Sequence, residues 1–154
     1  MYSVKDIANW FLYKVDRESG DSITHLKLQK LVYYTQAWSL VLNKSLFDEN
    51  FEAWAHGPVV RSLFETYRDA GWEALGLPSE ELIEFDKETE KIISDVWEIY
   101  GEHTGKYLEH LTHSEDPWII ARGDLSPEEK SASIIEKKSM ENFYKKMYQD
   151  LSNG

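Results

Sequence analysis

The stretch that decides the fold runs from residue 25 to residue 43 and reads HLKLQKLVYYTQAWSLVLN. Apolar residues recur along it at helical spacing, and they cover more than one face of the predicted helix. A helix that is apolar around most of its circumference must be surrounded by other elements. The sequence therefore predicts a mainly α fold, a compact helical domain around a buried central helix over about residues 25–43. The apolar or buried positions are Leu26, Leu28, Leu31, Val32, Tyr33, Tyr34, Thr35, Ala37, Trp38, Val41 and Leu42.

The flanking segments predict about six or seven helices in total. Residues 4–15 carry an apolar stripe behind Ser3, a residue type that caps helices well. Residues 51–55 and 133–135 read as short strands, so we also expect a two-stranded ribbon. Further helix starts are predicted at Pro58, Asp86, Thr104, Asp116-Pro117, the capping-box pattern from Ser126 to Glu129, and Ser139.

Composition excludes several classes of protein. The chain has 154 residues, which fits one domain over 1–154, and it has no cysteine, so disulfides and thiolate metal sites are excluded. A net charge of −11 repels phosphate backbones and argues against direct binding of nucleic acid. No apolar run is long enough to span a membrane, and the first residues lack the pattern of a signal peptide. We therefore expect a cytoplasmic protein that contacts no membrane.

Acidic residues gather between Glu80 and Glu102, where only Lys87 and Lys91 carry positive charge. A run of this kind is usually the solvated face of a helix. It can also attract a basic partner. The sequence leaves both interpretations open.

Motifs for catalysis are missing, and we expect neither an enzyme nor a cofactor. His110 and His113 are three residues apart, but two imidazoles need further ligands to hold zinc, which His103, Glu109 or Glu115 would have to supply. We expect no metal site. A small hydrolase that uses His113 with Glu115 or Asp116 remains an alternative, although Asp116 is explained more simply as a helix cap.

The segment His56-Gly57-Pro58, with Trp54 and Arg61 beside it, is the least ordinary part of the chain. Glycine permits backbone angles that other residues avoid, and proline fixes the next angle, so the segment predicts a rigid turn. This turn can be purely structural. It can also present Trp54, His56 and Arg61 to a partner, since aromatic and arginine side chains often anchor interfaces.

Three separate segments resemble, in order, the motifs of the Panacea domain, also called the SocA-like antitoxin domain. They are LKLQKLVYY at 26–34, LFDE at 46–49 with EAWAHGPVV at 52–60, and LTHSEDPW at 111–118. Together they span about residues 25–122. The helical segment at residues 3–16 also fits the usual start of this family.

The resemblance implies a mostly helical fold and the role of an antitoxin in a bacterial or phage-associated toxin–antitoxin system. Such a domain binds a cognate protein toxin and neutralises it, and the family has no catalytic residues to transfer. In the SocA branch the antitoxin is instead an adaptor that delivers its toxin to the ClpXP protease. An acidic antitoxin would be steered towards a basic toxin, so we expect a basic partner.

The same motifs give the candidate partner-binding residues, which we expect to meet in space. They either form an interface or act as a structural clamp, and the sequence does not separate these roles. The residues are Trp54, His56, Gly57, Pro58 and Arg61 in one segment and His113, Glu115 and Trp118 in the other.

Overall fold

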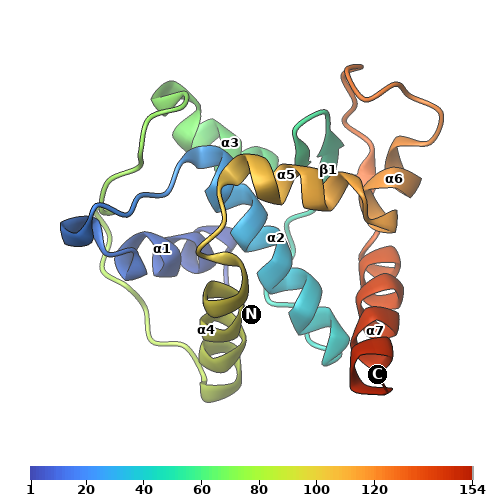
Figure 1. Cartoon of the computed structure of the whole chain (residues 1–154). Coiled ribbons are helices and arrows are strands. Elements are labelled where there is room, and N and C mark those ends of the chain that lie inside the picture. The colour runs from blue at the N-terminus through green and yellow to red at the C-terminus, as the bar shows by residue number, and fades with distance from the viewer. Residues whose placement is uncertain (154) are drawn as a thin grey trace.

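The helix at the centre of the sequence is also the element around which the structure is arranged (Figure 1). The computed structural model describes residues 1–153, which form seven α-helices and a small sheet. Helix α2 spans His25–Val41 and most of its side chains are buried, which confirms the mainly α fold around a buried central helix. The other helices are α1 (Val4–Lys14), α3 (Arg61–Tyr67), α4 (Lys87–Tyr100), α5 (Gly105–His113), α6 (Asp116–Arg122) and α7 (Lys137–Asn153), with 3-10 turns at Arg17–Ser19 and Arg68–Ala70.

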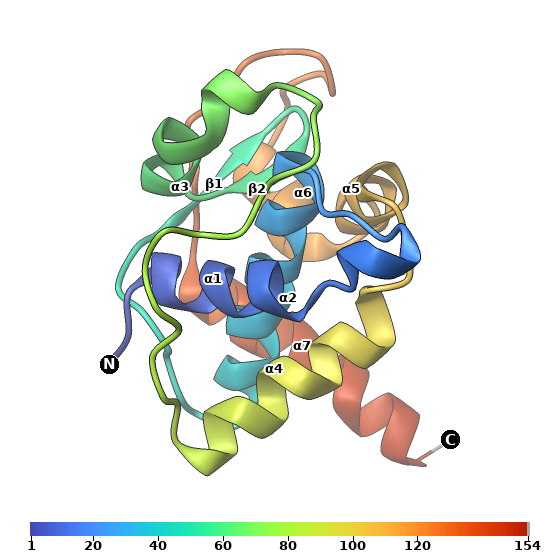
Figure 2. The same ribbon diagram turned by 90° about the vertical axis from the view of Figure 1, so that its left-hand side faces the viewer.

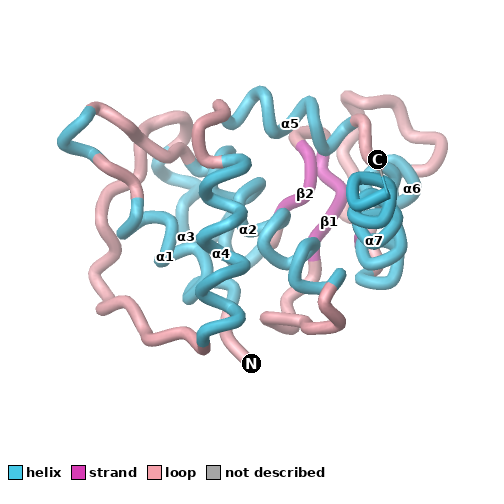
Figure 3. The backbone as a smooth tube through the Cα atoms, turned by 60° about the horizontal axis from the view of Figure 1, so that its bottom comes forward, coloured by secondary structure: helices cyan, strands magenta, loops and turns pink. Residues whose placement is uncertain are grey.

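The other helices surround α2 on several sides. Helices α1 and α4 lie on one side of it and α7 lies on the other, while α5 crosses near one end (Figures 1 and 3). The long segment between α3 and α4 runs along the outside of α1 (Figure 2). The hydroxyl of Tyr13 donates to the carbonyl of Glu80, and the hydroxyl of Tyr2 donates to Asp86 over 2.6 Å. These bonds fasten the long segment to the helical body.

Polar side chains on α2 hold the segments that pass over it. The amide of Gln36 accepts from the backbone N–H of Leu46 over 2.8 Å and donates to the carbonyl of Phe47 over 3.0 Å. Gln29 accepts from the N–H of Val60 over 3.0 Å and donates to the carbonyl of the same residue over 3.3 Å. Buried backbone groups need such partners, so these glutamines fix the paths of both segments.

The sheet has three strands, in the order β2-β1-β3, and all pairs are antiparallel. Strands β1 (Phe51–Trp54) and β3 (Ile134–Ile135) fall where the sequence predicts strands. The prediction of a two-stranded ribbon therefore lacks one strand, because a third strand, β2 (Gly57–Val59), also pairs with β1. The prediction that Pro58 begins a helix is wrong. Pro58 lies in an edge strand, where proline is tolerated, and α3 begins at Arg61.

Three predicted helix starts are confirmed by their capping bonds. The side chains of Ser3, Asp86 and Thr104 accept hydrogen bonds from backbone N–H groups in the first turns of α1, α4 and α5. In α1 the bonds form a complete capping box with Asp6. These residues therefore act as the caps that the local sequence predicts.

The remaining three predicted starts need correction. Helix α6 is preceded by Glu115 at the cap position, so Asp116 lies inside the first turn and is not the cap. Ser126 does bond to Glu129, but the segment stays a turn, because polar residues with no apolar stripe follow it. Helix α7 begins at Lys137, two residues before Ser139.

No helix within residues 1–153 combines the length and the apolar character needed to cross a membrane.

Gly57, at the start of β2, offers a test of how tightly the hairpin is packed on α2. Its φ is +99°, and a Cβ placed there would lie 2.7 Å from Cε of Lys30 and 2.9 Å from Oγ1 of Thr112. Gly57→Ala should therefore lower the free energy of unfolding by about 2–4 kcal/mol, from backbone strain and overlap together. Urea denaturation measures this loss.

Gly20 provides the matched control. Its φ is +96°, but nothing lies within 4 Å of a Cβ built there. Gly20→Ala should show the backbone strain alone, about 1–2 kcal/mol. Equal losses in the two variants would contradict tight packing of the hairpin against Lys30.

Candidate interaction site at the β1–β2 hairpin

The structure brings the two predicted site segments together at the β1–β2 hairpin. The indole Nε1 of Trp118 donates to the carbonyl of Trp54 over 2.8 Å. The ring of His113 stacks on Trp118 with centroids 4.1 Å apart. The guanidinium of Arg122, on α6, lies 5.0 Å from the centre of the Trp118 ring and donates to the carbonyl of Ala53 over 2.9 Å. Helices α5 and α6 thus support the back of β1.

Trp118 and His113 therefore belong to the supporting side of the hairpin. Trp118 is buried, and the Nε2 atom of His113 is buried without a hydrogen-bond partner. Burial lowers the pKa of His113, so its ring is neutral near pH 7. These two side chains therefore pack behind the hairpin, in the position that a structural clamp would occupy.

Trp54 and Arg61 lie on the outer side of the hairpin, where Glu52 links them. Arg61 donates to both carboxylate oxygens of Glu52, over 3.0 Å and 2.7 Å, and Trp54 Nε1 donates to the same carboxylate over 2.9 Å. The Arg61 guanidinium also lies 5.4 Å from the Trp54 ring, which packs against Phe64. A bidentate pair of this kind sets the orientation of both side chains. The Trp54 indole is therefore held in place at the surface.

His56 occupies the turn between β1 and β2 and is held from α5. Its Nδ1 lies 2.9 Å from Glu109, whose other carboxylate oxygen pairs with Lys106 over 3.1 Å. Burial raises the pKa of Glu109, but the hydrogen bonds from Lys106 and His56 outweigh it and the pKa lies below its ordinary value. Glu109 is thus an ionised, buried anchor for an exposed histidine.

Lys30 lies directly beneath this turn and has no exposed surface. Its Nζ donates to the carbonyl of Pro58 over 3.2 Å, and it forms no ion pair within residues 1–153. Burial lowers the pKa of Lys30 to about 7, against a weaker opposing effect of Glu109. A buried lysine with so few partners is unusual and often marks a functional site.

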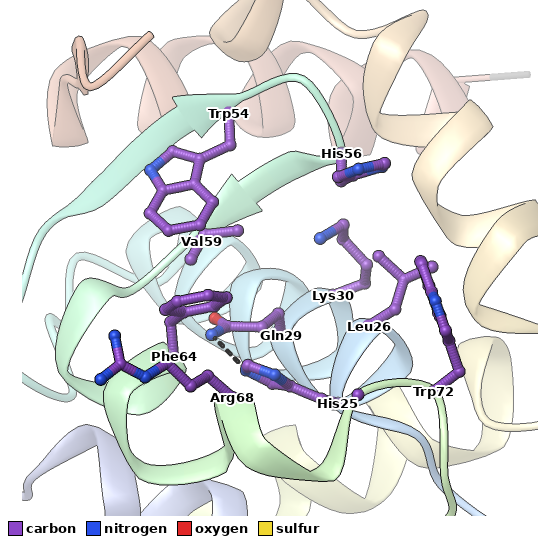
Figure 4. A pocket seen from close by; sticks show the side chains of 11 residues that line it. His25, Leu26, Gln29, Lys30, Trp54, His56, Val59, Phe64, Arg68 and Trp72 are labelled. Carbon is purple, nitrogen blue, oxygen red and sulfur yellow. Dashed lines mark hydrogen bonds between the residues drawn. The ribbon is translucent and has the colours of Figure 1, made fainter. Parts of the chain in front are cut away.

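Two hollows flank the hairpin turn, and Trp54 and His56 line both. The first hollow has a volume of about 280 Å³, and the second has a volume of about 570 Å³. In Figure 4, Gln29 and Lys30 rise from α2 at the floor of the first hollow, between Trp54 and Trp72. The first hollow is lined by His25, Leu26, Gln29, Lys30, Trp54, His56, Val59, Phe64, Arg68, Gly71 and Trp72, and the second by Trp54, Ala55, His56, Arg61, Glu128, Lys130, Ser131 and Ala132.

Glu115 lies away from the hairpin surface, between α2 and α7. Its carboxylate is buried and accepts hydrogen bonds from the hydroxyls of Tyr34 over 2.7 Å and Tyr144 over 2.9 Å. Tyr33 adds a further hydroxyl 3.1 Å from that of Tyr144. Of the predicted site residues, Glu115 therefore has a structural position, joining the central helix to the last one.

The histidine pair on α5 does not gather further ligands. The rings of His110 and His113 lie 6.4 Å apart. Within residues 1–153, no group of three or more His, Asp or Glu side chains is arranged to hold a metal ion.

Sequence reasoning missed several residues that shape the hairpin surface, namely Lys30, Glu109 and Trp72. One signal was available, because Lys30 stands in a helix that is otherwise apolar on nearly every side. Such a helix favours burial of its lysines, although Lys27, on the same helix, is only partly buried. The sequence around Glu109 and Trp72 gives no comparable signal, since both residues belong to this surface only through contacts with His56, which is more than 15 residues away along the chain.

The buried carboxylate of Glu115 gives a prediction about pH. Burial raises its pKa, although the two tyrosine hydroxyls oppose this. Because the folded chain holds this proton more tightly than the unfolded chain, its contribution to stability is complete below the unfolded pKa. That contribution is lost as the pH rises through the folded pKa. Glu115→Gln keeps an acceptor for both tyrosines. It should gain stability relative to the wild type as the pH rises from the unfolded pKa of about 4 through the raised folded pKa, by about 1.4 kcal/mol per unit of raised pKa.

Urea denaturation at several pH values measures this difference, and Glu84→Gln, at an exposed position, is the control. The control should show no comparable trend. A difference between Glu115→Gln and the wild type that stays constant with pH would contradict the raised pKa.

Comparison with known proteins identifies the family. Searches of curated proteins and of solved structures gave no match. The family model described as "Antitoxin SocA-like, Panacea domain" matches residues 28–119, more than half of the chain. The matched range contains most of α2, the whole β1–β2 hairpin and the supporting Trp118. The chain therefore belongs to the SocA-like antitoxin family that is defined by the Panacea domain.

Proposed function

We propose that this protein is an antitoxin that neutralises a cognate protein toxin by binding it, and that it catalyses no reaction of its own. Family membership supports a role of the antitoxin type. The observation that carries the proposal is the hairpin, on which Trp54 and His56 stand between two hollows. Aromatic side chains that border pockets are typical anchors of protein interfaces.

The hairpin is suited to binding because its exposed side chains are fixed before a partner arrives. Glu52 orients Trp54 and Arg61, and Glu109 orients His56. Holding side chains in place beforehand lowers the entropy lost on association. The surface therefore needs little rearrangement to bind a toxin.

The acidic charge of the chain supports a basic toxin as the partner. The net charge is −11, and α4 and the segment before it carry much of it on exposed residues. Opposite charge accelerates encounter over distances up to roughly the Debye length, about 8 Å at physiological salt. We place this encounter in the cytoplasm of a bacterium, with the toxin gene beside the antitoxin gene on a chromosome or a prophage.

Co-expression tests the proposal. Each neighbouring open reading frame is induced alone and together with this protein. We expect one neighbour to stop growth alone and to be tolerated together with the protein. If no neighbour is both toxic and rescued, the proposal is wrong. The amount of toxin distinguishes two modes of action: direct inhibition leaves the toxin level unchanged, while delivery to ClpXP lowers it only in cells that contain the protease.

Trp72 allows a sharper test of the surface. Its side chain is 71% exposed and meets the edge of His56 with centroids 6.3 Å apart. Trp72→Ala should therefore leave the melting temperature nearly unchanged but weaken the complex with the rescued toxin at least tenfold, as truncation of an interface tryptophan commonly does. Calorimetric titration measures the affinity.

Tyr148→Ala is the control for loss of an exposed aromatic group, because Tyr148 is 55% exposed on α7, away from the hairpin. This variant should bind as the wild type does. Equal affinities for all three proteins would remove Trp72 from the interface.

A further inference from the structure

The first hollow differs in charge from the rest of the molecule. The whole sequence has 28 acidic and 17 basic residues, yet none of the described residues that line this hollow is acidic. Lys30 and Arg68 are the cationic residues of the lining, although Arg68 also pairs with Glu65 over 3.4 Å. His56 adds an imidazole at the rim, and His25 adds one that is neutral because burial lowers its pKa to about 4. The local environment therefore favours an anionic group, although the chain as a whole is acidic.

Lys30 is the buried cationic residue of this hollow. An ammonium group has three donors, and Lys30 uses one described bond, to the carbonyl of Pro58. Glu109, the nearby carboxylate, is already paired with His56 and Lys106. Burying a charge without a partner is unfavourable, and the lowered pKa of Lys30 reflects this. An anion bound in the hollow would offset that unfavourable burial.

The rest of the lining is apolar and aromatic. The rings of Trp54, Phe64 and Trp72 stand around the floor that α2 provides (Figure 4). Trp54 packs on Phe64 with centroids 4.8 Å apart, so one wall is continuous. An occupant thus needs an apolar group as well as a negative charge.

Size and shape favour a short piece of polypeptide over a cofactor. The volume of about 280 Å³ lies just below the range of about 300–1,000 Å³ that is usual for small-molecule sites. An adjoining hollow of about 560 Å³ shares Leu26, His56 and Trp72 with the first, and none of its described lining residues is acidic. This hollow therefore borders the first one at Leu26, His56 and Trp72, and an extended chain could reach both.

We propose that the first hollow binds an anchor segment of the toxin in which a large apolar side chain is followed by a carboxylate. The apolar group packs among Trp54, Phe64 and Trp72. The carboxylate lies beside the rim imidazole of His56, above the buried ammonium of Lys30 (Figure 4). The identity of the partner rests on the proposed function, while the chemistry of the hollow can be tested without the toxin.

Peptide binding tests the chemistry. The probe is the dipeptide acetyl-Phe-Glu-amide, and acetyl-Phe-Gln-amide matches it in size without the charge. The indole N–H signals of Trp54 and Trp72 in NMR spectra report binding, with a millimolar Kd expected for so small a ligand. We expect acetyl-Phe-Gln-amide to bind at least tenfold more weakly. Equal binding of both peptides, or no shift of either indole signal, would overturn the proposal.

Lys30→Met tests the role of the buried ammonium. Methionine is similar in length and apolar, so the variant should stay folded, as replacing an ill-partnered buried charge usually permits. It should bind the two peptides with equal, weak affinity. Lys146→Met, which removes one charge from an exposed position on α7, is the control and should keep the preference for acetyl-Phe-Glu-amide. A Lys30→Met protein that keeps this preference would overturn the proposal, and its thermal unfolding curve verifies that it is folded.

Co-expression then tests the toxin as the source of the carboxylate. Lys30→Met should lose rescue of the toxin at an unchanged protein level, while Lys146→Met should retain it. Unimpaired rescue by Lys30→Met would overturn the assignment to the toxin. Rescue by the wild type without peptide binding would overturn this inference and leave the proposed function intact. Peptide binding with no toxic neighbour to rescue would overturn the proposed function and, with it, the toxin as the ligand.

Discussion

The structure depends on one constraint: the central helix is buried, so its polar side chains must find partners inside the protein. Gln36 satisfies the backbone at Leu46 and Phe47, and Gln29 satisfies both backbone groups of Val60. Lys30 donates to the carbonyl of Pro58. These bonds join α2 to the segment before the β1–β2 hairpin, to strand β2 and to the residue that follows it. Because unsatisfied buried groups are unfavourable, the hairpin cannot shift without exposing or orphaning several of them.

This constraint explains why an exposed surface can be rigid. The hairpin is fixed from below by Lys30 and Gln29 and from behind by Trp118. Because the backbone of the hairpin is fixed, the orientation of its exposed side chains depends mainly on hydrogen bonds and ion pairs between them, such as the pair between Glu52 and Arg61. Of the candidate residues in the two motif segments, His113 and Trp118 lie behind the hairpin, and Trp54, His56 and Arg61 lie nearer the surface.

The sequence predicts those features that local rules determine. The apolar coverage of residues 25–43 indicates a buried helix, and Ser3, Asp86 and Thr104 act as caps because a cap depends only on the next three residues. The local sequence does not determine the place of Pro58, since a proline suits both a helix start and an edge strand. Pairing with β1 and the bond from Val60 to Gln29, 31 residues before Val60 along the chain, favour the strand. The same difference explains why only part of the candidate site can be predicted. Its motif residues are recognised from their neighbours in the sequence, whereas the burial of Lys30 beneath Pro58 depends on the hairpin folding over α2.

The acidic surface and the basic hollow act over different distances and so do not conflict. Long-range attraction depends on net charge and raises the rate at which a basic toxin arrives. Once the surfaces touch, the fit depends on the groups that are desolvated, and the described lining of the first hollow contains Lys30 and no acidic residue. A basic partner that lacks a suitable carboxylate would be attracted to the surface but would leave Lys30 without a counter-charge. Under the proposed function, the hollow would therefore provide the discrimination between toxins that net charge alone cannot.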